Sequence, residues 1–191
     1  MTHRIAIFAS GNGTNAQRIT EYFENEKHIK VSLILTNNKS AFVIERAKKL
    51  NIPSGVFSKS ELEQGDILLK TLAENEINWI ILAGFLLRIP EYLINAFSDH
   101  IINIHPALLP KYGGKGMYGD FVHKAVINNN EVESGITIHY VNEVYDAGEI
   151  IFQARICVDE QDTPESLAKK IHKLEYEYFP MIIKKTIVTS R

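Results

Sequence analysis

The sequence predicts an α/β fold in which a mostly parallel sheet carries helices on both faces. Two observations lead to this prediction. Apolar runs of strand length alternate with longer amphipathic stretches through the first half of the chain, as in repeated strand–helix units. The run Trp79–Ala83 is almost continuously apolar, as expected for a strand that is buried on both faces. We therefore expect a Rossmann-like, doubly wound sheet of about seven strands.

The first half of the chain supplies the parallel strands and the helices between them. The expected strands are Arg4–Ala9, Lys30–Thr36, Ser54–Phe57, Trp79–Ala83 and Ile101–Ile104. The expected helices are Asn15–Glu26, Ala41–Leu50, Glu61–Glu76 and Pro90–Phe97. The third of these helices is predicted to be continuous, with its apolar positions at Ile67, Leu68, Leu72 and Ile77.

The second half departs from this alternation. The expected elements are a glycine-rich loop at Tyr112–Gly119, a helix at Asp120–Asn130, and two strands at Gly135–Val141 and Glu149–Val158. Since so short a connection joins antiparallel strands, the last two strands should form an antiparallel pair. Thr163 and Pro164 then form the N-cap and first position of a long helix, which we expect to kink near Pro180.

Composition excludes several classes of protein. The 191 residues suit a single domain, residues 1–191, and the formal charge of −2 gives no reason to expect nucleic acid as a partner. One cysteine, Cys157, excludes an internal disulfide and a metal cage made of thiolates alone, and we interpret it as a buried strand residue. The chain has neither a signal-peptide pattern nor a membrane-spanning run, so we expect a cytoplasmic protein without a membrane partner.

A glycine-rich loop, Ser10–Ala16, lies between the first strand and the first helix. Gly11 and Gly13 allow a tight turn, and the helix that follows adds unsatisfied N–H donors for an anion. The spacing also fits a dinucleotide fingerprint, but strand two ends in Leu35–Lys39 without the carboxylate that would hold a ribose. A single phosphate is therefore the better ligand, and a turn without a ligand is the alternative.

Asn103 and His105 are the first candidates for catalysis. Side chains alternate along a strand, so both should lie on one face, at the strand end where ligands bind to open α/β sheets. The alternative is that they only satisfy backbone groups of the following loop. Thr137 and His139 alternate in the same way on a later strand, and Asp146 follows in a tight turn.

An isolated aspartate in such a turn is usually structural. Beside a histidine of the neighbouring strand, Asp146 would orient the imidazole and favour its protonated form. The remaining histidines are interpreted as surface or packing residues: His3, His28, His100, His123 and His172.

These motifs, in this order, resemble those of the phosphoribosylglycinamide formyltransferases, which are folate-dependent. The similarity rests on Ser10–Asn15, Leu82–Phe85, Asn103–Tyr112 and Asp146–Gly148, and it covers essentially the whole chain. It implies formyl transfer from 10-formyltetrahydrofolate to the amine of phosphoribosylglycinamide, without a metal. The nucleotide-phosphate half would span about 1–100 and the catalytic and folate half about 101–191.

The resemblance assigns Asn103, His105 and Asp146 to catalysis. It implies that Asn103 and a protonated His105 both donate to the developing oxyanion. Asp146 would hold His105 charged and help to move a proton from the amine to the folate nitrogen. It implies three binding sets: Gly11, Asn12, Gly13 and Thr14 with the Asn15 side chain for phosphate; Glu175 for the glycinamide end; and Leu86, Leu87, Arg88, Ile89, Asn103, Val141 and Asp146 for the folate. From helical statistics alone, Glu175 would be a solvated residue.

The sequence departs from the family pattern at Gly113–Gly119, where a histidine often occurs, and Lys59 is only a loose match for a phosphate-binding arginine. A formyltetrahydrofolate hydrolase would use the same triad, although such enzymes usually carry a regulatory domain before it. Transfer-RNA and amino-sugar formyltransferases are longer and lack this phosphate loop. The non-enzymatic alternative is a nucleotide-binding module. We expect small-molecule substrates only, and either a monomer or a homodimer.

Overall fold

The computed structural model describes residues 2–190. Its strands are β1 (His3–Phe8), β2 (Ile29–Thr36), β3 (Ser54–Val56), β4 (Trp79–Leu82), β5 (Ile101–His105), β6 (Glu133–Tyr140) and β7 (Ile150–Cys157). Its helices are α1 (Thr14–Phe23), α2 (Val43–Lys49), α3 (Lys59–Gln64), α4 (Asp66–Glu74), α5 (Glu91–Ala96), α6 (Asp120–Asn128) and α7 (Pro164–Thr189). The chain divides into two compact units between Ile102 and Asn103.

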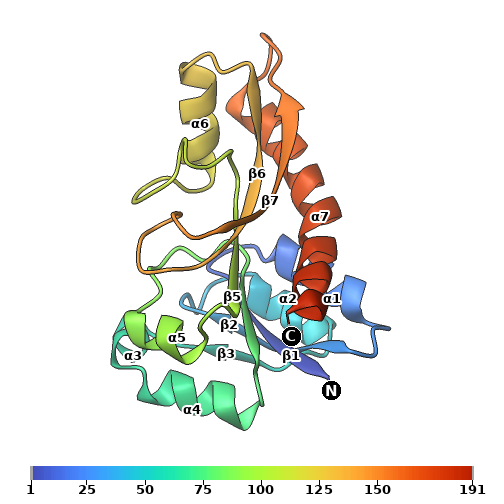
Figure 1. Ribbon diagram of the computed structural model, residues 1–191, viewed down its shortest axis with the longest axis vertical. Coiled ribbons are helices and arrows are strands. Elements are labelled where there is room, and N and C mark those ends of the chain that lie inside the picture. The colour runs from blue at the N-terminus through green and yellow to red at the C-terminus, as the bar shows by residue number, and fades with distance from the viewer. Residues whose placement is uncertain (1, 191) are drawn as a thin grey trace. The chain divides into compact units, whose positions relative to one another are not determined.

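The strands hydrogen-bond in the order β3-β2-β1-β4-β5-β6-β7, and β5 passes from the first unit into the second (Figure 1). β1 is parallel to β2 and β4, and β2 is parallel to β3. β6 and β7 are antiparallel. The predicted α/β class, the seven mostly parallel strands and the antiparallel pair near the C-terminus are therefore confirmed.

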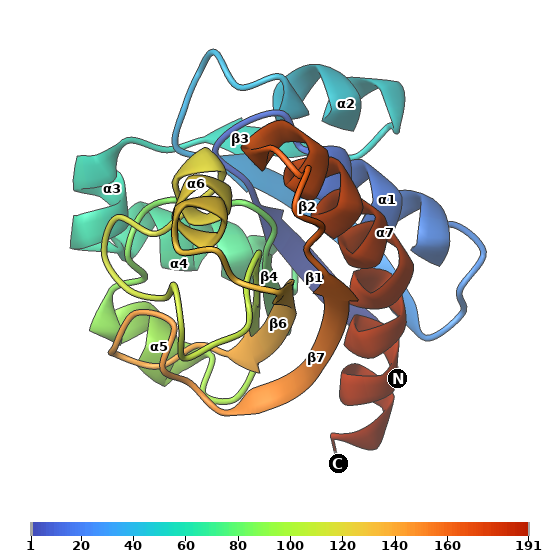
Figure 2. The same cartoon turned by 90° about the horizontal axis from the view of Figure 1, so that it is seen from above.

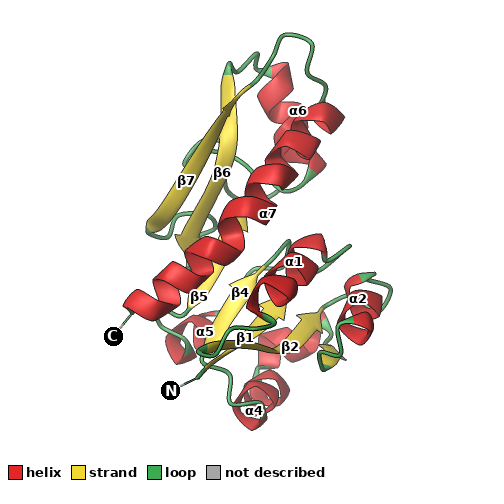
Figure 3. Cartoon of the chain, turned by 90° about the vertical axis from the view of Figure 1, so that its right-hand side faces the viewer, coloured by secondary structure: helices red, strands yellow, loops and turns green. Residues whose placement is uncertain are grey.

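In the first unit, helices cover both faces of the parallel strands. α1 and α2 lie side by side (Figure 2), and α4 lies on the face opposite α1 (Figure 3). The consecutive residues Ile5, Ala6 and Ile7 are all fully buried, as expected for a strand that is covered on both faces. The loops that follow such strands are held by a packed core, so they can position ligand-binding groups.

The predicted helix Glu61–Glu76 is wrong as one element, because Gly65 divides it into α3 and α4. Gly65 has φ +89°, and a Cβ at this position would lie 2.8 Å from the Tyr92 ring. The periodic spacing of leucines gave no sign of this tertiary contact. Leu68 and Leu72 are buried as expected, but the side chain of Ile67 is 58% exposed.

In the second unit, α7 packs against β6 and β7 (Figure 3). Phe152 of β7 and Tyr178 of α7 have ring centroids 5.1 Å apart. Thr163 caps α7 as predicted: its side chain accepts from Ser166 N, and Pro164 takes the first turn. The helix continues through Pro180 to Thr189.

Cys157 is exposed at the end of β7, so its interpretation as a buried strand residue is wrong. β7 is the last strand of the sheet, and each of its residues is either half-buried or exposed. Within residues 2–190, no helix is long and apolar enough to cross a membrane.

Candidate active site

A cluster of polar side chains forms in the second unit where β5 and β6 end. Asp146 Oδ2 lies 3.6 Å from His105 Nδ1, and Asp146 Oδ1 lies 3.7 Å from His139 Nε2. Asn103 Nδ2 lies 3.0 Å from His139 Nε2. The structure thus brings together the three residues predicted for catalysis, and it adds His139 as a fourth member.

The tight turn before β7 directs Asp146 toward the histidines. Asp146 has φ +54°, a left-handed conformation that aspartate tolerates better than most residues. Gly148 allows the turn to close, because a Cβ there would lie 1.7 Å from Tyr140 O. Asp146 Oδ2 also accepts a hydrogen bond of 2.9 Å from Gly114 N. The glycine-rich loop after β5 therefore helps to hold this carboxylate in place.

His105 is 3% exposed, and both of its ring nitrogens have polar neighbours. Nε2 donates to Tyr112 O at 2.7 Å, since a carbonyl can only accept, and Nδ1 faces Asp146. Burial lowers the pKa of His105 below its ordinary value and outweighs the opposing attraction of Asp146. Burial therefore opposes the predicted protonation of this imidazole, and Asp146 favours it.

His139 orients the carboxamide of Asn103. Its Nδ1 donates to Tyr140 O at 2.7 Å, which leaves Nε2 of the neutral ring to accept from Asn103 Nδ2. Burial also lowers the pKa of His139 and keeps it in this neutral form. The alternation of Thr137 and His139 in the sequence was the signal for this residue. Nothing in the sequence indicated that it bonds to Asn103 rather than only to Asp146.

Thr137 has a structural role beside the cluster. Its Oγ1 donates to Ala107 O at 2.7 Å and accepts from Leu109 N at 3.0 Å. These bonds fix the segment that follows His105. Thr137 and His139 share a face of β6 as the alternation predicts, and each contacts part of the segment that begins at Asn103.

The glycine-rich loop of the first unit lies between β1 and α1. Ser10 Oγ donates to Asn37 Oδ1 at 2.6 Å and accepts from Leu86 N at 2.9 Å, so the start of the loop is fixed on two sides. Gly13 is the N-cap of α1 with φ +73°, and a Cβ there would lie 2.3 Å from Val43. Only glycine fits this position. The first turn of α1 carries no acidic residue that would repel an anion.

Other predicted binding residues lie in each unit. In the first, Leu86 is 47% exposed and Ile89 is buried, so the segment offers both surface and packed apolar groups. In the second, Glu175 of α7 is only 6% exposed. The expectation from helical statistics that this residue faces solvent is therefore wrong. Val141 directly follows β6 and is half-buried. Lys59 is an exposed residue of α3, with its Nζ 3.6 Å from Glu63.

His123 of α6 is a packing residue, which agrees with its predicted class. Burial lowers its pKa from 6.5 to about 4, with a smaller contribution from His172. Its Nδ1 has no hydrogen-bond partner among the described residues. Within residues 2–190, no group of three or more histidine, cysteine, aspartate or glutamate side chains could hold a metal ion.

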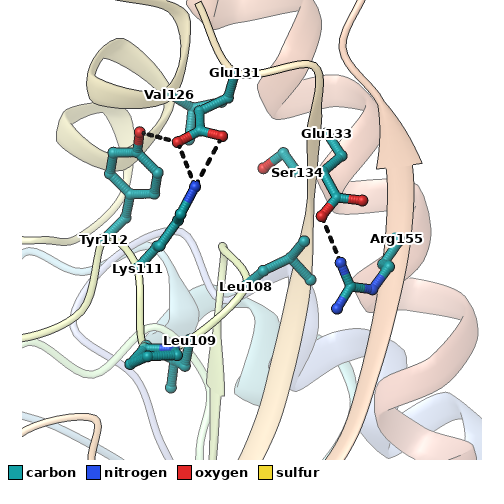
Figure 4. A pocket seen from close by; sticks show the side chains of 10 residues that line it. Leu108, Leu109, Lys111, Tyr112, Val126, Glu131, Glu133, Ser134 and Arg155 are labelled. Carbon is teal, nitrogen blue, oxygen red and sulfur yellow. Dashed lines mark hydrogen bonds and ion pairs between the residues drawn. The ribbon is translucent and has the colours of Figure 1, made fainter. Parts of the chain in front are cut away.

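A pocket of about 220 Å³ in the second unit contains none of the predicted site residues (Figure 4). Its charged side chains pair with one another: Lys111 Nζ lies 2.9 Å from Glu131, and Arg155 Nη1 lies 2.5 Å from Glu133. The buried Ser134 Oγ is sealed from solvent. These pairings leave the pocket without a charge that is free for a ligand, so the cluster around Asp146 is the stronger candidate.

The chain is similar to known proteins over almost its whole length. A family model described as formyl transferase matches residues 3–183. A phosphoribosylglycinamide formyltransferase of Bacillus subtilis is 37% identical over 191 residues, which are 96% of this chain and 94% of that protein. A chloroplastic protein of the same name from Arabidopsis thaliana is 41% identical over 94% of this chain.

This chain spans less than two thirds of the plant relatives, 64% of the Arabidopsis protein and 59% of one from Vigna unguiculata. Among solved structures, glycinamide ribonucleotide transformylase 1 from Geobacillus kaustophilus superposes with a TM-score of 0.88 at 34% identity. The superposition covers 97% of this chain and 98% of the Geobacillus chain.

Proposed function

Since this chain belongs to the formyl transferase family, we propose that it transfers a formyl group from 10-formyltetrahydrofolate to the amine of 5′-phosphoribosylglycinamide. The observation that carries the proposal is the buried contact of Asp146 with His105, beside the Asn103 carboxamide. Acyl transfer to an amine needs a donor for the developing oxyanion and a route for one proton. This cluster supplies groups suited to both tasks.

Asn103 is the proposed oxyanion donor. One N–H of its amide is engaged by His139, and the other remains to stabilise the negative charge that develops on the formyl oxygen. The gain grows as the carbonyl becomes tetrahedral, so the bond favours the transition state over bound substrate. Removal of one such donor typically lowers turnover by about 10²- to 10³-fold.

His105 and Asp146 are the proposed proton-transfer pair. The amine nitrogen bonds to the formyl carbon, the bond from that carbon to the folate nitrogen breaks, and one amine proton ends on the folate nitrogen. Burial lowers the pKa of His105 and so favours a neutral ring that can accept a proton, and the nearby carboxylate stabilises the resulting imidazolium. In this proposal His105 moves a proton, whereas the family resemblance implies a protonated His105 that donates to the oxyanion.

The binding roles follow the family pattern. We propose that backbone groups of Gly11–Thr14 and the Asn15 side chain hold the phosphate, where the positive end of α1 favours an anion. Glu175 would engage the glycinamide end. Leu86–Ile89 and Val141, with Asn103 and Asp146, would hold the pteridine. The cytoplasmic location, the lack of a metal requirement, and a monomeric or homodimeric state remain predictions.

Incubation with 10-formyltetrahydrofolate, with and without phosphoribosylglycinamide, tests the proposal. We expect release of tetrahydrofolate only when the amine is present, with formylated amine formed in equal amount. Folate turnover without the amine would instead identify a hydrolase. If no turnover occurred in either mixture while nucleotide still bound, the chain would be a binding module. A chelator added to the active mixture should leave the rate unchanged.

A further inference from the structure

Arg46 of α2 contacts the glycine-rich loop, although the function proposed above gives it no role. Its Nε donates to Asn12 O at 2.8 Å, and its Nη2 donates to Asn12 Oδ1 at 2.9 Å. Its third nitrogen, Nη1, bonds to Gln17 of α1. The guanidinium also lies over the Phe42 ring, 5.0 Å from its centroid. These contacts fix the side chain in one orientation.

α2 holds three successive residues of the loop. Val43 N donates to Gly11 O at 3.2 Å, Arg46 binds Asn12 O, and the Val43 side chain fills the space where Gly13 would carry a Cβ. Two consecutive peptide carbonyls of the loop therefore point toward α2.

The direction of the carbonyls determines the direction of the amides. In a trans peptide unit the C=O and N–H groups point in opposite directions, and the only cis bond among the described residues is Leu109–Pro110. Because Gly11 O and Asn12 O face α2, the N–H groups of Asn12 and Gly13 face away from it. Two successive N–H groups on one side of a loop form a concave donor site for an anion.

We infer that Arg46 is a positioning residue for phosphate: by holding Asn12 O, it directs the amides of Asn12 and Gly13 toward the phosphate of the substrate. This inference rests on the proposed function, because it assumes that the loop binds a phosphate monoester. The guanidinium also adds positive charge beside the loop without touching the ligand itself. The role therefore uses both the charge and the shape of arginine. Its planar guanidinium donates to both oxygens of Asn12 at once, which a lysine cannot do.

Phosphate binding to the full chain tests the inference directly. Inorganic phosphate and ribose 5-phosphate are titrated into wild type, Arg46→Gln, Arg46→Lys and the matched control Lys49→Gln by calorimetry. Lys49 is an exposed cation of the same helix, so its loss removes one charge from α2 without touching the loop. Thermal unfolding of each variant checks that it is folded.

We expect Arg46→Gln to bind ribose 5-phosphate about 10-fold more weakly, which corresponds to about 1.4 kcal/mol. Arg46→Lys should remain weakened despite its charge, and Lys49→Gln should bind as wild type does. In the formyl transfer assay, Arg46→Gln should raise KM for phosphoribosylglycinamide. Its kcat and its KM for 10-formyltetrahydrofolate should be unchanged, a separation that general damage to the fold would not produce.

Two results would overturn the inference alone. One is wild-type phosphate affinity in Arg46→Gln, and the other is full recovery in Arg46→Lys, which would show that only charge matters. If wild type itself bound neither phosphate compound, the phosphate assignment in the proposed function would fail together with this inference. The wild-type titration therefore separates the two failures.

Discussion

Asp146 Oδ2 lies 3.6 Å from His105 Nδ1, although α6 and β6 separate the two residues in the chain. Both side chains are removed from solvent, with 11% of the Asp146 and 4% of the His105 side chain exposed. Charge interactions are stronger in such surroundings than at the surface, since less water screens them. We therefore expect the largest effect on turnover from a substitution that removes the charge of this pair and keeps its shape.

We expect Asp146→Asn to lower kcat by about 10²- to 10⁴-fold, the range for loss of a proton-transfer group. The amide retains the size of the carboxylate but cannot stabilise an imidazolium at His105. Affinity for ribose 5-phosphate, measured by calorimetry, should be nearly unchanged. Glu160→Gln is the control, because Glu160 is an exposed acid outside the cluster. Retained turnover with a large loss of phosphate affinity would contradict the assigned role.

His139→Ala should lower kcat about 10-fold, because Asn103 would lose the partner that orients its amide. We expect His139→Gln to recover part of the rate, since its amide oxygen can accept the same hydrogen bond. Steady-state kinetics with both substrates provide the measurement. His172→Ala, at an exposed position, is the control. Equal rates for the alanine and glutamine variants would argue against positioning by a hydrogen bond.

Acid should destabilise the fold through its buried histidines. The pKa of His123 falls to about 4 in the folded chain, and the pKa values of His105 and His139 are also lowered. An unfolded histidine titrates near 6.5, so between pH 6.5 and 4 the unfolded chain binds more protons and stability falls as the pH is lowered. Above pH 6.5 this stability is fully present. Urea unfolding at pH 7.5 and pH 5 measures the loss.

His123→Leu should reduce this loss by on the order of 1 kcal/mol at pH 5, because each unit of pKa shift is worth about 1.4 kcal/mol. At pH 7.5 the variant should be close to wild type or more stable, since the buried Nδ1 has no hydrogen-bond partner among the described residues. His28→Gln, at an exposed position, is the control. An unchanged difference between the two pH values would refute the assignment to His123.

Gly65→Ala should destabilise the chain by about 1 to 3 kcal/mol, the usual cost of overpacking. The added methyl meets the Tyr92 ring, which cannot move easily because its hydroxyl donates to Leu62 O at 2.6 Å. Gly116→Ala separates the cost of a positive φ from the cost of contact with the ring. Gly116 has a similar φ of +91°, but a Cβ there would meet nothing within 4 Å. Equal denaturation midpoints for the two variants would show that the ring contact costs nothing.

Much of the fold could be predicted from the sequence because its signals are local. A strand is recognised from a few consecutive apolar residues, and the start of α7 is recognised from Thr163 and Pro164. The division at Gly65 was missed because its cause, the Tyr92 ring, is remote in the sequence. The exposure of Cys157 was missed because it depends on how other elements pack against the end of β7.

By itself, the sequence determined the element types, the antiparallel pair near the C-terminus, and the residues Asn103, His105 and Asp146 as the group to examine. Only the tertiary structure decided that His139 binds Asn103 and that burial prevails over Asp146 in the pKa of His105. The reason is physical. Periodicity and capping depend on neighbours within one or two turns of the chain, whereas a hydrogen bond between strands and the loss of solvent around an imidazole depend on packing among remote segments.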